Sequence, residues 1–215
     1  MNDKQSLIIM GTHLFAEEVA DLVSECTGYQ LVGVCENWER SRSEGELLGL
    51  PVFWIDALPS LADTHQAVCA IGTTKRDDFI HQVEAIGFHF ATVVHPSARV
   101  SKTSHVGTGS ILSAGVIVAA KSRIGRHVII NRGCLIGHHT HVGDFVTISP
   151  GANIAGRVKI GNRTYIGMGS IILDRVTIGR QVVVGAGALV TKDVPDNVQV
   201  MGVPARITKQ GIEGR

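Results

Sequence analysis

The sequence predicts a two-part protein: an α/β domain over residues 1–93, then a solenoid of short parallel β-strands from residue 94 onward. Three observations lead to this fold class. Strand-like and helix-like segments alternate before residue 94, and an aliphatic residue falls on every sixth position after it. Glycine is also unevenly spread, with 7 of the 25 glycines in residues 1–99 and 18 beyond. The two parts therefore follow different local rules.

The first 93 residues alternate between the two regular structures. Strand-like apolar segments lie at 6–11, 29–37, 67–72 and 90–96, and helix-like segments at 12–25, 57–62 and 74–87. In the first helical segment Phe15, Val19 and Leu22 stand at helical spacing. Such alternation predicts a parallel sheet covered by helices, which binds ligands beyond the carboxyl ends of its strands.

The turn after the first strand lacks the dinucleotide fingerprint. After Gly11 the sequence continues Thr12-His13-Leu14-Phe15, so the second glycine of GxGxxG is missing. The turn can still offer backbone N–H groups to a phosphate. Glu36 ends the second strand, where an acidic side chain commonly meets a hydroxyl group or a base edge.

The repeat beyond residue 94 fits neither an amphipathic helix nor an alternating strand. The repeated aliphatic positions are Val94, Val100, Val106, Leu112, Val118, Ile124, Ile130, Ile136, Val142, Ile148, Ile154, Ile160, Ile166, Ile172, Ile178, Val184 and Val190. The next residue is usually small, which lets the chain turn a corner. Three six-residue units then close one triangular coil of 18 residues, with the aliphatic side chains in a narrow lumen. The span 94–190 is a little over five coils.

Composition excludes several classes of protein. Lys plus Arg is 20 and Asp plus Glu is 19, so a formal charge of +1 gives no electrostatic reason to expect binding to nucleic acid or to an anionic membrane. No apolar run approaches the 18 residues of a membrane span. Four scattered cysteines without a CxxC pair, behind a start with no signal-peptide pattern, predict reduced thiols in a cytoplasmic protein.

The repeat and the segment GAGALVTKDVPDNVQVMGVPAR (185–206) resemble the hexapeptide-repeat acyltransferases, whose fold is a left-handed parallel β-helix. The junction VVHPSARV (93–100) resembles a narrower family, the bacillosamine and perosamine N-acetyltransferases and the sialic acid O-acetyltransferases. This resemblance implies a Rossmann-like nucleotide-sugar domain at 1–93, a β-helix at 94–206 and a C-terminal tail at 207–215. It further implies a homotrimer and an acetyl-CoA-dependent N-acetyltransferase that acts on a nucleotide-linked amino sugar.

The resemblance also assigns residues by position. In the N-terminal domain the residues that correspond to the sugar-nucleotide site are Thr12, His13, Leu14, Glu36, Asn37 and Gly72. For the β-helix the acetyl-CoA groove corresponds to Thr147, Met168 and Ala186, with Gly151, Gly156, Gly167 and Gly187 permitting close approach. Lys192 and Arg206 stand near the exit of the solenoid, where they could meet the phosphates of CoA or simply face solvent.

Acetyl transfer requires a base, a donor to the oxyanion and a groove for the pantetheine arm. In VIINRGCLIGHHTHVGDFVTISPG (128–151) the segments VIIN and GDF match the family, which places its catalytic histidine on His138. The family's following carboxylate is here His139, and its later histidine is Thr147, whose hydroxyl could donate a similar hydrogen bond. Asp144 is a further acid that could assist the base.

Other interpretations stay open from the sequence. His139 is the alternative base, whereas His141 fits an exposed corner. A zinc site of the three-histidine type takes ligands from different coils, so histidines crowded at one corner predict no metal. Sugar O-acetylation is the nearest alternative activity, and a metal-dependent hydratase or a non-catalytic scaffold would be different classes of protein.

Overall fold

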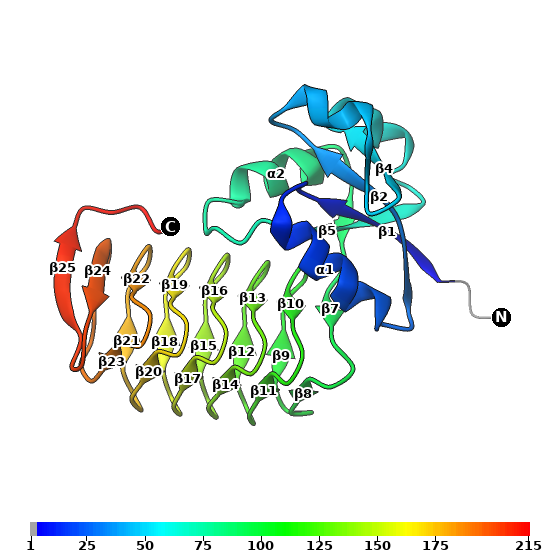
Figure 1. Cartoon of the computed structure of the whole chain (residues 1–215). Helices are drawn as coiled ribbons and strands as arrows, with labels where there is room; N and C mark the ends of the chain where they lie inside the picture. The colour runs from blue at the N-terminus through cyan, green and yellow to red at the C-terminus, as the bar shows by residue number, and fades with distance from the viewer. Residues whose placement is uncertain (1–3) are drawn as a thin grey trace. The chain divides into compact units, whose positions relative to one another are not determined.

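The computed structural model describes residues 4–215, so the first three residues of the predicted N-terminal domain lie outside it. The chain forms two compact units, shown in Figure 1 by the colour gradient along the sequence. One unit holds the chain up to Gly72 together with Arg76–Pro96. The other holds Thr73–Lys75 together with Ser97–Arg215.

The N-terminal unit is built around a mainly parallel sheet with strand order β3-β4-β2-β1-β5-β6. Its strands are β1 (Gln5–Met10), β2 (Tyr29–Glu36), β3 (Glu46–Leu47), β4 (Leu50–Trp54), β5 (His65–Cys69) and β6 (His89–Phe90). β7 (Val93–Val94) follows in the chain but belongs to a different sheet. The α-helices are α1 (Leu14–Ser24) and α2 (Asp77–Ala85), and the 3₁₀ helices are η1 (Arg40–Glu44) and η2 (Ile55–Ser60). The alternation expected from the sequence is thus confirmed.

The sheet buries its central strand on both faces. Leu7, Ile8, Ile9 and Met10 of β1 are all buried, as expected for a parallel strand covered by helices. The hairpin of β3 and β4 is absent from the sequence-based elements, because β4 is short and carries Pro51. β4 nevertheless pairs in parallel with β2, with Glu36 opposite Trp54.

The second unit is a three-sided parallel β-helix (Figure 1). One side consists of β10 (Ile111–Leu112), β13 (Ile129–Ile130), β16 (Thr147–Ile148), β19 (Tyr165–Ile166), β22 (Val183–Val184) and β24 (Val198–Met201). The second side consists of β8 (Arg99–Val100), β11 (Ile117–Val118), β14 (Leu135–Ile136), β17 (Asn153–Ile154), β20 (Ile171–Ile172) and β23 (Leu189–Val190). The third side consists of β9 (His105–Val106), β12 (Arg123–Ile124), β15 (His141–Val142), β18 (Lys159–Ile160) and β21 (Thr177–Ile178).

The register confirms the predicted 18-residue coil. Each strand pairs with the strand 18 residues later, as Ile111 does with Ile129. The repeated aliphatic residues from Leu112 to Val190 point into the lumen and are at most 4% exposed. Val94, the first member of the predicted series, is 36% exposed instead. A side chain in the lumen is fully covered only where a coil stacks on both sides of it. Val94 stands at the first, open end of the β-helix, where no coil precedes it.

The C-terminal segment closes the last coil. β25 (Arg206–Gln210) pairs antiparallel with β24, so the predicted tail from residue 207 begins as a strand. Beyond it, the backbone N–H of Thr74 donates to the carbonyl of Arg215 at 2.7 Å, and the N–H of Arg215 donates to the Thr74 hydroxyl at 2.9 Å. Among residues 4–215, neither length nor apolar content qualifies a helix to cross a membrane.

Candidate functional site

Two adjacent imidazoles occupy the corner between β14 and β15. His138 Nδ1 lies 3.0 Å from His139 Nδ1, and the rings are perpendicular with centroids 5.2 Å apart. Both side chains are exposed. His139 has a left-handed backbone with φ of 58°. This conformation turns the chain at the corner between the two strands. The sequence placed both residues in the catalytic role, and the structure brings them into hydrogen-bond distance.

The same corner carries cations on the neighbouring coils. Lys121 and Arg157 stand 18 residues before and after His139, with the same left-handed backbone. The N–H of His139 donates to the carbonyl of Ala120, and the N–H of Arg157 donates to that of His138, so the corners stack in register. Burial, then the charges of His138, Lys121 and Arg157, lowers the pKa of His139. Its ring is therefore held neutral to a lower pH than a free histidine.

Gly156 leaves room for the His138 ring. A Cβ at this position would lie 2.7 Å from His138 Nε2, closer than side chains pack. The sequence assigned Gly156 to the acetyl-CoA groove. The structure places it beside the histidine ring. Ala120 takes the same corner position one coil before His138 and two coils before Gly156.

Other polar residues near His138 in sequence lie elsewhere on the coil. Asp144 follows β15 at the next corner, where its Oδ1 accepts a hydrogen bond of 2.8 Å from the N–H of Arg126. Thr147 lies in β16 and is buried. His141 is exposed at the start of β15, in register with Arg123 and Lys159 on the third side of the helix. Within one chain, Asp144 and Thr147 therefore stand on other parts of the coil than the histidine pair.

Met168 and Ala186 line one groove of about 610 Å³ beside the C-terminal strand. Tyr165, Lys209 and Arg215 also line it, and the guanidinium of Arg215 lies 4.4 Å from the centre of the Tyr165 ring. The groove thus joins an apolar floor to two cations, which suits a pantetheine arm and its phosphates. Gly151 shares the left-handed corner geometry of Gly187, with φ of 69° and 65°, but does not line this groove.

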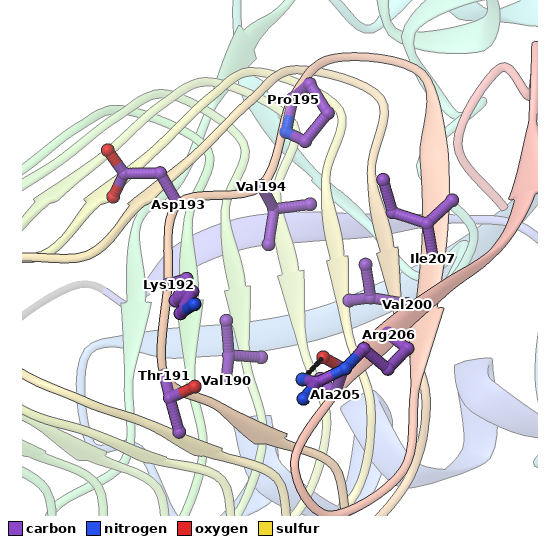
Figure 2. Close-up of a pocket in the computed structure, with 10 residues that line it drawn as sticks. All are labelled: Val190, Thr191, Lys192, Asp193, Val194, Pro195, Val200, Ala205, Arg206 and Ile207. Carbon is purple, nitrogen blue, oxygen red and sulfur yellow. Dashed lines mark hydrogen bonds between the residues drawn. The ribbon is translucent and has the colours of Figure 1, made fainter.

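Lys192 and Arg206 meet at a different pocket, of about 310 Å³ (Figure 2). Val190, Val194 and Val200 form its inner wall, so the pocket continues the apolar lumen at the last coil. Ala205, Arg206 and Ile207 border it, and the guanidinium of Arg206 donates to the carbonyl of Ala205 at 2.9 Å. An apolar pocket with charges only at its rim offers little to a phosphate.

The predicted substrate residues of the N-terminal unit gather at one edge of its sheet. Because β1, β2 and β5 are parallel, the segments that follow them emerge at the same edge. These segments carry Thr12, His13, Leu14, Glu36, Asn37 and Gly72. His13 is the N-cap of α1 but makes no side-chain hydrogen bond to the helix, so side-chain capping does not occupy the first N–H groups of α1.

Glu36 is engaged within the unit and not open to solvent. Its Oε2 accepts a hydrogen bond from the Thr12 hydroxyl, and its Oε1 accepts from the backbone N–H groups of Asn37 at 2.9 Å and Trp38 at 2.7 Å. Burial works to raise the pKa of this carboxyl, but these hydrogen bonds outweigh it and hold the pKa below its ordinary value. With Glu36 only 4% exposed, the carboxylate stabilises the loop where the sequence predicted a ligand contact.

Trp38 is a candidate that the sequence reasoning missed. It directly follows Glu36 and Asn37, yet its side chain is 91% exposed, and Leu14, the first residue of α1, is 81% exposed. An indole so exposed at the ligand-binding edge of a parallel sheet can stack on a flat ring. The available signal was the run ENW at the end of an apolar strand. A tryptophan directly after two polar residues stands out in a chain with only 5% aromatic residues.

Within the described range 4–215, His, Cys, Asp and Glu residues form no group of three or more that could hold a metal ion. The cysteines Cys26, Cys35, Cys69 and Cys134 are buried free thiols. Burial raises the pKa of Cys134 to about 11, which keeps it protonated and unreactive at neutral pH.

Comparison with families and curated proteins gives one match. The family model described as bacterial transferase hexapeptide (six repeats) matches residues 157–192. No curated protein matches the chain.

Solved structures are similar over nearly the whole length. A mutant of perosamine N-acetyltransferase from Caulobacter crescentus, in complex with CoA and GDP-perosamine, is 32% identical with a TM-score of 0.89, covering 95% of this chain and 97% of that one. The acetyltransferase domain of PglB from Neisseria gonorrhoeae, with acetyl coenzyme A, is 30% identical with a TM-score of 0.88, covering 95% and 100%. WeeI from Acinetobacter baumannii is 29% identical with a TM-score of 0.85, covering 94% and 98%. The left-handed β-helix expected from the repeat is confirmed.

Proposed function

The chain belongs to the hexapeptide-repeat sugar acetyltransferases and is an acetyl-CoA-dependent N-acetyltransferase; from this premise we propose that its acceptor is a nucleotide-linked amino sugar and that His138 is the general base. The observation that carries the proposal is the exposed His138, which pairs with His139 at a corner of the β-helix. Over 95% of its length the chain is similar to an enzyme whose structure holds CoA and GDP-perosamine.

The chemistry needs one acceptor of a proton near neutral pH. The amine of the sugar attacks the thioester carbonyl, a C–N bond forms, and the C–S bond to CoA breaks. His138 Nε2 accepts the proton that the amine loses and returns it to the departing thiolate. A histidine suits both steps because its unperturbed pKa of about 6.5 lies near the working pH.

Acetyl-CoA would lie against the groove that contains Met168 and Ala186. The support is an apolar floor flanked by Lys209 and Arg215, the side chains that can meet its phosphates. Thr147, Gly151 and Gly156 remain predicted neighbours of the donor, although they lie outside this groove on the single chain.

The N-terminal unit would be a Rossmann-like domain that holds the nucleotide. Its support is the parallel sheet with a helix start at the ligand edge, where N–H groups of α1 can face a diphosphate. His13, Leu14, Asn37 and Gly72 border this edge, and Trp38 offers the stacking surface for the base. Thr12 and Glu36 shape the loop instead of contacting the ligand directly.

The assembly would be a homotrimer. The second side of the β-helix exposes the apolar side chains of Ile117, Leu135 and Ile171, with Leu173 at the following corner. Asn153 takes the same position on the coil between Leu135 and Ile171. Exposed apolar side chains grouped on one side are typical of a surface that a second copy covers. Light scattering at micromolar concentration tests this, with three times the 22.9 kDa chain mass expected and the mass of one chain contradicting it. Buried free thiols favour a reducing compartment, and hence the cytoplasm.

Release of free CoA thiol tests the activity. The protein is incubated with acetyl-CoA and either GDP-perosamine, a UDP-linked amino sugar or free sialic acid. Thiol release with an amino-sugar nucleotide, together with an acetamide in the product, supports the proposal. Thiol release with sialic acid alone would identify an O-acetyltransferase, and the absence of release with every acceptor would contradict the proposed acceptor class.

A further inference from the structure

The pairing of His138 with His139 constrains where their protons lie. Two ring nitrogens 3.0 Å apart need one hydrogen between them, so one Nδ1 donates and the other accepts. If His138 Nδ1 donates, its Nε2 keeps a lone pair and can take a proton from a substrate. If His139 Nδ1 donates, a neutral His138 carries its hydrogen on Nε2 and has no basic nitrogen left for the reaction.

We infer that His139 is a positioning residue, a neutral hydrogen-bond acceptor that holds His138 with its proton on Nδ1 and its Nε2 free to act as base. This inference rests on the proposed function for its catalytic consequence. An acceptor is needed to fix the tautomer, and a neutral ring supplies one.

The stacked corners favour the uncharged form of His139, whose Nδ1 is able to accept a hydrogen bond. The groups that face it are His138 beside it, Lys121 on the preceding coil and Arg157 on the following coil. One coil further, Arg175 takes the same corner position and lies 3.7 Å from Asp174. Positive charges on both sides oppose a third positive charge on His139, in the same direction as its burial.

Protonation of His139 would reverse the hydrogen bond. An imidazolium has hydrogens on both nitrogens, so its Nδ1 must donate and His138 Nδ1 must accept. The base is then lost even though His138 itself is uncharged. Because the pKa of His139 is lowered, this reversal requires a lower pH than it would with an ordinary histidine.

Matched substitutions at residue 139 separate the hydrogen bond from the fold. His139→Gly removes the acceptor, and glycine adopts the left-handed backbone without strain. His139→Asn keeps an oxygen acceptor near the position of Nδ1 and also tolerates this backbone. We expect kcat with acetyl-CoA and GDP-perosamine to fall about 10-fold in the glycine variant, with KM little changed, and to recover to within about 3-fold in the asparagine variant. Equal losses in both variants would overturn the inference.

The pH profile tests the charged neighbours. Lys121→Glu places a carboxylate in the column and raises the pKa of His139, so the acid limb of kcat should move to higher pH. Lys121→Gln should move it less, and neither change should move the limb when combined with His139→Asn. An acid limb that stays in place in Lys121→Glu contradicts the inference.

A measurement without substrate separates this inference from the proposed function. Histidine ¹⁵N chemical shifts in the full-length protein report which ring nitrogen carries the hydrogen. Hydrogen on His138 Nδ1 and on His139 Nε2 at neutral pH supports the pair, whether or not acetyl transfer is found. An active enzyme with hydrogen on His138 Nε2 overturns the inference. If the hydrogens lie on His138 Nδ1 and His139 Nε2 but the protein acetylates no amino sugar, only the proposed function is contradicted.

Discussion

The N-terminal unit and the β-helix use their polar side chains in opposite ways. At the ligand edge of the N-terminal sheet, the carboxylate of Glu36 is buried and bonded to Thr12 and the loop backbone. At the corner after β14, His138 and His139 are exposed and bonded to each other. The first arrangement stabilises a loop, and the second leaves two imidazoles open to solvent.

The two regions also differ in charge. Residues 1–96 carry 5 Lys and Arg against 14 Asp and Glu, a net charge of −9, whereas residues 97–215 carry 15 against 5, a net charge of +10. The formal charge of +1 for the whole chain conceals this division. A basic β-helix favours an anionic acyl donor, whereas charge does not help an acidic unit to hold a nucleotide as proposed. The proposed nucleotide site would therefore depend on backbone N–H groups and on stacking, for which Trp38 is an exposed aromatic side chain.

The largest expected effect tests whether the chemistry belongs to the β-helix. Replacing His138 by Ala or Asn removes the proposed base, and removal of a general base typically lowers the rate about 10²–10⁴-fold. We expect kcat to fall by at least 100-fold, with KM for both substrates nearly unchanged. Steady-state kinetics with GDP-perosamine check this, and a variant that keeps a tenth of the wild-type kcat would show that another group acts as base.

The next effect concerns the space around that base. In Gly156→Ala the new Cβ would lie 2.7 Å from His138 Nε2, so the ring must move. Because such a displacement disturbs a reacting nitrogen, kcat should fall about 10-fold while the melting temperature changes little. Ala120→Gly, two coils before Gly156 at the same corner position, is the matched control and should keep the wild-type kcat. A raised KM for acetyl-CoA with an unchanged kcat would instead support the donor-groove role predicted from the sequence.

The contrast between the units also explains what could be predicted from the sequence. In the β-helix, residues 18 apart stack, so the lumen from Leu112 to Val190 follows from one short rule. The rule fails at Val94 because the first turn has no coil before it. The same spacing of 18 would have pointed from His139 to Lys121 and Arg157, but the contact between the two imidazoles depends on a left-handed corner that no pattern of residue types shows.

In the N-terminal unit no repeat amplifies the signal. Strand and helix positions follow from periodicity, whereas the hairpin of β3 and β4 does not, because Pro51 interrupts its short apolar run. The edge that gathers Thr12, Glu36 and Gly72 follows from parallel strands. Whether a carboxylate there faces a ligand or its own loop depends on side-chain geometry, so the sequence predicts that Glu36 lies at this edge but not which group it contacts, and it does not predict the exposure of Trp38.

A smaller effect tests whether the acidic unit binds by stacking. Stacking of a base on an aromatic side chain contributes about 1–3 kcal/mol. Trp38→Ala should therefore weaken the binding of GDP-perosamine by roughly 10-fold, as measured by calorimetry on the full chain, and leave acetyl-CoA binding unchanged. Trp38→Phe should restore most of the affinity. Unchanged affinity in Trp38→Ala would place the base elsewhere on the unit.

The smallest effect should be on stability alone. Glu36→Gln keeps the shape of the side chain but weakens the hydrogen bonds that Thr12 and the loop donate to it, so the free energy of unfolding should fall by about 1–3 kcal/mol with kcat nearly unchanged. The pKa of Glu36 is lowered on folding, so its stabilisation is complete above the ordinary value of 4.5 and is lost as the pH falls below it. The difference in the free energy of unfolding between wild type and Glu36→Gln should accordingly shrink in acid.

Both tryptophans, Trp38 and Trp54, lie in this unit, so tryptophan fluorescence during urea unfolding follows the unfolding of this unit selectively. Glu39→Gln is the matched control, because this exposed carboxylate pairs only with Arg42 and Ser41 at the surface, and it should unfold almost as wild type does. If Glu36→Gln keeps wild-type stability and instead loses affinity for the sugar nucleotide, the carboxylate is a ligand after all, and the contrast between a stabilising and a reactive use of polar groups does not hold.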